Sequence, residues 1–111
     1  MNKYSQIALK AAKYVKEGLN PEEAWEKASC EIFEKGSNSQ KKGCPKNAFI
    51  GLYGINTNSK NAQYAIKALN YLKDNKINDI TTKELWDIVG GGISHNHQMN
   101  VVLALYKEGM I

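Results

Sequence analysis

The sequence predicts an all-α protein, a compact single domain of five or six short helices. Apolar residues recur at helical spacing, capping residues and glycines divide the chain at short intervals, and no segment has a convincing strand period. A chain of 111 residues is long enough for one domain with a modest core. We therefore expect residues 1–111 to form a single helical domain.

Two amphipathic helices are predicted in the first third of the chain, over about residues 2–17 and 21–35. The apolar stripe of the first consists of Tyr4, Ile7, Ala8, Ala11 and Val15. The second begins with Asn20-Pro21-Glu22-Glu23, which combines an N-cap, a first-turn proline and a capping box. Gly36 is expected to end it.

The third predicted helix, over about residues 45–53, is short and largely apolar, which predicts a central position in the core. Cys44 precedes a proline and is expected to be non-helical, at or near the N-cap. Gly51 would allow a neighbouring element to approach closely, and Gly54 ends the helix.

Three further helices are predicted, over about residues 60–74, from Thr82 onwards, and near the C-terminus. Their predicted N-terminal signals are Ser59, the capping box Thr81-Thr82-Lys83-Glu84, and Ser94 or Asn96. The run Gly90-Gly91-Gly92 acts as a terminator between the last two helices. Both tryptophans, Trp25 and Trp86, lie on helical stripes and are expected in the core.

All fifteen basic residues are lysines, and they are unevenly distributed. Residues 1–35 are neutral overall, residues 36–83 carry a net charge of +6, and residues 84–111 carry −2. A lysine-rich solvated surface is the simplest interpretation. No apolar run approaches a membrane span, and two cysteines make no disulfide framework, so we expect a protein of the reducing cytoplasm.

The strongest candidate site lies where the third helix begins, at Lys41, Lys42, Gly43, Cys44 and Lys46. Free backbone N–H groups at a helix start, with lysines nearby, suit a phosphate or a carboxylate. The pattern of a nucleotide-binding P-loop is absent. The structural alternative is a tight entry to a buried helix.

The same thiol supports a second interpretation, a cysteine-dependent enzyme. A helix start and nearby lysines favour the thiolate of Cys44, and His95 or His97 would serve as its base if the fold brought them close. Cysteine without family-specific partners is weak evidence, so we expect no catalytic residue. His95 and His97 are also unsuited to a metal, because no Cys or Asp stands at a useful spacing; they are expected to satisfy free amides at a helix start.

Residues 81–108 imitate a helix-turn-helix, with a Thr- and Glu-capped short helix, a turn and a second helix. The would-be recognition helix has one lysine at its far end and no arginine, which disfavours nucleic acid. The +6 middle segment could still contact phosphates.

Four segments together resemble a family of small bacterial proteins that carries no assigned function. They are Lys41-Lys42-Gly43-Cys44-Pro45-Lys46-Asn47-Ala48-Phe49-Ile50-Gly51-Leu52, then Asn58-Ser59-Lys60-Asn61 with Tyr64-Ala65, then residues 97–106 (HQMNVVLALY), and the signature Pro21-Glu22-Glu23-Ala24-Trp25. The resemblance covers nearly the whole chain and implies a domain without a mechanism. The chain departs from the family pattern after Gly54, where a loop is shortened, and at His95-Asn96-His97.

Together these observations predict a non-enzymatic binding or interaction module without a cofactor. Its expected partner is an anionic small molecule or an acidic patch on a protein. The alternatives are a helix-turn-helix protein that binds nucleic acid through residues 81–108 and a cysteine-dependent enzyme at Cys44.

Overall fold

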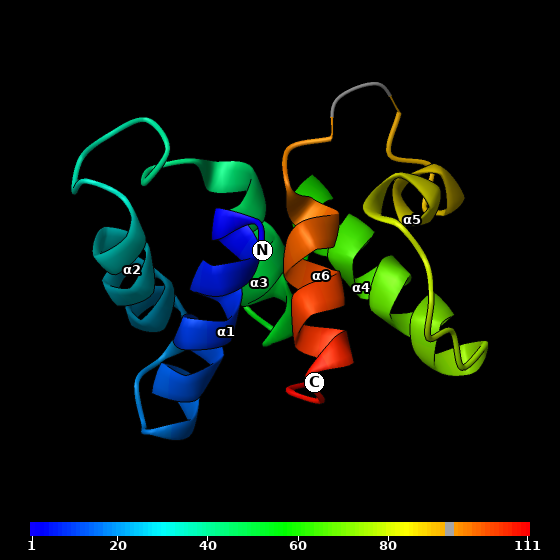
Figure 1. Ribbon diagram of the computed structural model, residues 1–111, viewed down its shortest axis with the longest axis horizontal. Helices are drawn as coiled ribbons and strands as arrows, with labels where there is room; N and C mark the ends of the chain where they lie inside the picture. Colours follow the sequence, from blue (N-terminus) through cyan, green and yellow to red (C-terminus); the bar gives the residue numbers. More distant parts are fainter. Residues whose placement is uncertain (93–94) are drawn as a thin grey trace.

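The computed structural model describes residues 1–92 and 95–111, and these fold into six helices with no strand among them (Figure 1). The helices are α1 (Lys3–Lys16), α2 (Pro21–Ile32), α3 (Gly43–Leu52), α4 (Lys60–Asp74), α5 (Thr82–Ile88) and α6 (Gln98–Lys107). The prediction of an all-α fold is confirmed.

Helices α3 and α6 lie in the middle, between α1 and α2 on one side and α4 and α5 on the other (Figure 1). They contribute to both clusters of buried apolar residues. From α3, Phe49 and Ile50 join the cluster built on α1 and α2, whereas Ala48 joins the cluster built on α4 and α5. The predicted central position of α3 is therefore correct, and α6 shares it.

The contact between α3 and α4 depends on Gly51, as its sequence position suggested. A Cβ atom added to Gly51 would lie 2.3 Å from the Cβ of Ala62 and 2.8 Å from its Cα. Only a glycine facing a small residue lets the two helix backbones approach this closely. Residues 43–52 are thereby fixed against the longest helix of the described chain.

Most of the predicted helix starts are confirmed. The side chains of Asn20, Ser59 and Thr81 accept hydrogen bonds from first-turn amides of α2, α4 and α5. Thr81 and Glu84 form a complete capping box. At the other end of α5, Gly90 takes a φ of 73°, which confirms the glycine run as a terminator.

Two local predictions about α2 and α3 are wrong. Helix α2 ends at Ile32 rather than near Lys35, because Phe33 turns extended and packs its ring against Tyr4 with 5.3 Å between centroids. Cys44 lies inside α3 rather than before it. The missing N–H of Pro45 removes no helical hydrogen bond in a first turn, so the helix can start two residues earlier.

The predicted cap of the last helix is also wrong. The N-cap of α6 is His97, and Asn96 stays outside the helix with its amide bonded to the side chain of Gln98 at 2.7 Å. The alternative cap, Ser94, lies outside the described residues. Within the described chain, no helix combines the length and apolar character needed to cross a bilayer.

Candidate functional site

The candidate site is the first turn of α3, where Lys42 is the N-cap and Gly43, Cys44 and Pro45 follow. No side chain in the described chain caps this helix. Because proline has no N–H, the amides available in this turn are those of Gly43 and Cys44. In α1, α2, α4 and α5 a side chain accepts a hydrogen bond from a first-turn amide. The corresponding amides of α3 have no such side-chain partner in the described chain.

The loop before α3 is held by Gln40, whose role we did not predict. Gln40 is 5% exposed, and its amide nitrogen donates to Ser29 Oγ at 2.9 Å. Its Oε1 accepts from the Gly36 amide at 3.1 Å. A further bond, from the Tyr4 hydroxyl to the Ser39 carbonyl at 2.9 Å, ties the loop to α1. A polar residue in a polar loop carries no periodic signal, so its burial could not be predicted from the sequence.

The three lysines of the candidate site differ in exposure and surroundings. Lys41 is exposed and Lys42 is half-buried beside the free amides. Lys46 is half-buried one turn along and borders a hollow of about 480 Å³, together with Leu19, Glu22, Glu23, Glu26 and Lys27. Three carboxylates around this hollow offset its positive charge. The residues left for an anion are Lys41, Lys42 and the amides of Gly43 and Cys44.

The structure does not bring Cys44 together with a histidine. Cys44 is a half-buried free thiol in α3. His95 Nε2 accepts from the Met99 amide at 3.1 Å, and the ring of His97 stacks on Tyr4 with 4.6 Å between centroids. Neither imidazole has a hydrogen bond or ring contact with α3 in the described chain, so no thiol–imidazole pair is assembled. The expectation that these histidines satisfy amides at a helix start is confirmed for His95.

The arrangement of α5 and α6 gives no support to a helix-turn-helix. Six of the ten residues of α6 are buried: Gln98, Met99, Val101, Val102, Leu103 and Leu105. A recognition helix must expose the face that enters the DNA groove. Helix α6 instead packs against α1, α3, α4 and α5, which leaves it little free surface.

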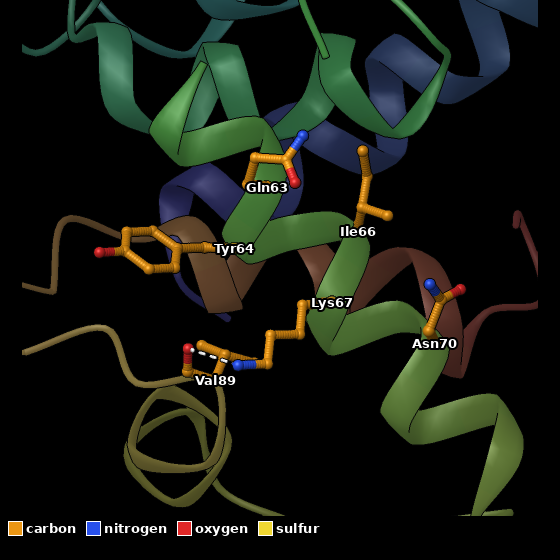
Figure 2. Close-up of a pocket in the computed structure, with 6 residues that line it drawn as sticks. All are labelled: Gln63, Tyr64, Ile66, Lys67, Asn70 and Val89. Carbon is orange, nitrogen blue, oxygen red and sulfur yellow. Dashed lines mark hydrogen bonds between the residues drawn. The ribbon is translucent and has the colours of Figure 1, made fainter. Parts of the chain in front are cut away.

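A groove between α4 and the end of α5 forms a second concave surface (Figure 2). Its volume is about 420 Å³, and its lining consists of Gln63, Tyr64, Ile66, Lys67, Asn70 and Val89. The ammonium group of Lys67 donates to the Val89 carbonyl at 3.5 Å, where a cation also faces the negative end of α5. The ammonium group of Lys67 is thus hydrogen-bonded within the protein, which makes it a weaker candidate for binding an anion in this groove.

The comparisons with known proteins identify the family but no activity. A family model described as a family of unknown function, DUF6979, matches residues 1–111. The chain belongs to DUF6979. No curated protein and no solved structure matches it. The resemblance to a family without an assigned function is confirmed.

For this DUF6979 protein, the chemistry must therefore be argued from the site. Among the described residues, no group of three or more His, Cys, Asp or Glu side chains is placed to hold a metal ion. Both cysteines are free thiols.

Proposed function

We propose that this DUF6979 protein is a non-enzymatic binding module that recognises an anionic group at the start of α3. The anionic group belongs to a small molecule or to an acidic patch of a partner protein. The observation that carries the proposal is the uncapped first turn of α3, with Lys41 and Lys42 directly before its free amides.

Helix electrostatics give the physical reason. The start of a helix carries a partial positive charge, which stabilises a nearby anion by about 0.3–1 kcal/mol at an exposed position. Hydrogen bonds from backbone amides to a charged acceptor add about 1.5–3 kcal/mol. The anchored loop favours binding, because Gln40 holds the residues before α3 in place before any ligand arrives.

The expected affinity for a single small anion is low, because the lysines are solvated and Lys46 faces glutamates. A ligand with several negative charges should bind more tightly and become weaker as salt is added. We also propose the reducing cytoplasm as the compartment, which the two free thiols support.

The test is an NMR titration of the ¹⁵N-labelled protein with inorganic phosphate. We expect saturable shift changes centred on the amides of Gly43 and Cys44, and weaker binding in the double variant Lys41→Gln/Lys42→Gln. The matched control is Lys73→Gln/Lys83→Gln, which removes the same charge at exposed positions. Shift changes away from α3, or equal loss of binding in both double variants, would refute the site.

A second measurement separates the proposal from the thiol enzyme. In the Cys30→Ser variant, we expect iodoacetamide to alkylate Cys44 at a rate within a few-fold of that of a free model thiol at about pH 6.5, which allows for the modest effect of the positive helix start. Alkylation many times faster than the model thiol would contradict a non-enzymatic module. A gel shift with nucleic acid at low salt would favour the nucleic-acid interpretation instead.

A further inference from the structure

Two histidines hold the start of α6. The N-cap, His97, has a left-handed backbone with φ of 70° and makes no side-chain cap. The acceptor for the first turn is His95, whose Nε2 takes the Met99 amide hydrogen at 3.1 Å. An imidazole nitrogen therefore serves as the helix cap, and it can do so only while it carries no proton.

His95 also joins α6 to α5. Its ring lies 5.1 Å from that of Trp86, and the Trp86 indole donates to the Gly92 carbonyl at 3.0 Å. Trp86 packs its edge against Tyr64 of α4, with 4.8 Å between centroids. Movement of His95 would remove the packing of its ring against Trp86.

His97 joins α6 to α1. Its ring stacks on Tyr4. Its Nδ1 lies 3.3 Å from the side-chain Nδ2 of Asn2 and 3.3 Å from Oδ1 of Asn100. Asn2 is the N-cap of α1, and Ser5 of α1 donates to the Asn100 carbonyl at 3.1 Å. The first turns of α1 and α6 lie side by side (Figure 1). The contacts of His97 and Ser5 tie them together.

We propose that His95 and His97 form an acid-sensitive joint, in which protonation of His95 releases the first turn of α6 from α5 and α1. A proton on Nε2 converts the acceptor of the Met99 amide into a donor that faces another donor. The new positive charge also lies at the positive end of α6 and 6.3 Å from the His97 ring.

A proton on His95 would have the Trp86 ring beside it but no hydrogen-bonded carboxylate among the described residues. No carboxylate in the described chain hydrogen-bonds to either ring, and Tyr4 is committed to the Ser39 carbonyl. Of the charged groups on the packed elements, Lys3 lies over the Phe33 ring, Lys67 contacts the Val89 carbonyl and Glu84 is in its capping box. Lys60, Lys83 and Asp87 are exposed to solvent. Burial is the main effect that lowers the pKa of His95 below its ordinary value, and the charge of His97 lowers this pKa further.

The sign of the pH dependence follows from this direction. The folded state binds the His95 proton less readily than the unfolded state does, so the joint contributes its full stability above the unfolded pKa of about 6.5. This contribution is lost as the pH falls from there towards the lower folded pKa.

Hydrogen exchange of the Met99 amide in the full-length protein tests the joint. Protection factors, which correct for the intrinsic pH dependence of exchange, should fall roughly threefold or more between about pH 7.5 and pH 5. Amides in the middle of α2, which is not in contact with the joint, should lose less of theirs. The fall should follow the protonation of His95, read from its imidazole ¹⁵N shifts in the same samples.

Two variants sharpen the test. His95→Gln keeps an acceptor at the position of Nε2 but does not titrate, so the fall at Met99 should disappear. His97→Asn keeps a residue that tolerates the left-handed backbone and removes the neighbouring charge, so the fall should move to higher pH. Unchanged Met99 protection in the natural protein while His95 protonates would overturn the proposal even if both variants failed to fold. The same fall in His95→Gln would overturn it as well.

Discussion

Single residues set the spacing and position of α3. At Gly51, any side chain would meet the backbone of Ala62, which cannot move aside as a flexible side chain would. At Gln40, one buried amide connects the loop before α3 to α2. The first position was predicted from the sequence, because a glycine inside an apolar helix indicates a close neighbour. The second was not, because it depends on the path of the loop.

Replacement of Gly51 by alanine should destabilise the protein by about 1–3 kcal/mol. Alanine gains up to about 1 kcal/mol of helix propensity over glycine, but the 2.3 Å approach to Ala62 forces α3 and α4 apart. Urea unfolding followed by circular dichroism measures the change. The matched control is Gly43→Ala in the same helix, whose new Cβ meets only the Asn47 side chain at 3.7 Å. Equal stability of both variants would show that the close contact is absent.

Replacement of Gln40 by alanine removes the donor to Ser29 Oγ, which keeps its own bond to the Glu26 carbonyl, and removes the acceptor of the Gly36 amide. The expected loss is about 1–3 kcal/mol, and phosphate binding at α3 should weaken because the loop is no longer anchored. Asn38→Ala, at an exposed position of the same loop, should change neither property. Normal phosphate shifts at Gly43 in a folded Gln40→Ala protein would separate the loop anchor from the site.

Among the elements, α5 depends most on its ends. It has only seven residues, and its contacts with the bundle go mainly to α6 and weakly to α4. A helix this short is marginal by itself, so its cap and its buried Leu85 and Trp86 carry its stability. The capping box that marked this helix in the sequence is therefore an essential part of it.

Thr81→Ala should destabilise α5 by about 1 kcal/mol, because the Glu84 amide loses the Thr81 hydroxyl that accepts its hydrogen bond, while the backbone half of the capping box remains. Faster hydrogen exchange confined to α5 would report this local change, with little effect on α1 and α2. Thr82→Ala, one residue into the helix, retains the box and serves as the control. An identical response in both variants would mean that the box contributes nothing.

Helix starts and stripes were predictable because they depend on neighbouring residues. Asn20, Ser59 and Thr81 cap the helices that they were expected to cap. One error arises where tertiary packing overrides the local signal, since Phe33 leaves α2 to pack on Tyr4. Another is itself local, because the α6 cap comes from His95, two residues before the N-cap position.

At the scale of the whole molecule, α3 and α6 unite two clusters of apolar side chains. Trp25 lies in the cluster of α1 and α2, and Trp86 lies in the cluster of α4 and α5. The expectation that both tryptophans are buried is confirmed, with exposures of 1% and 4%. The sequence predicted a central α3, but not the division of the core, which depends on which face of each helix meets which neighbour.

Helices α3 and α6 belong to both clusters and should therefore couple their unfolding. Unfolding measured at each tryptophan tests this coupling most directly. The variants Trp25→Phe and Trp86→Phe each leave one indole, which reports on one cluster. If the shared helices couple the clusters, then within each variant the fluorescence transition in urea coincides with the transition in helical circular dichroism. Separate transitions, with one cluster unfolding while the other and most of the helix content persist, would contradict the account.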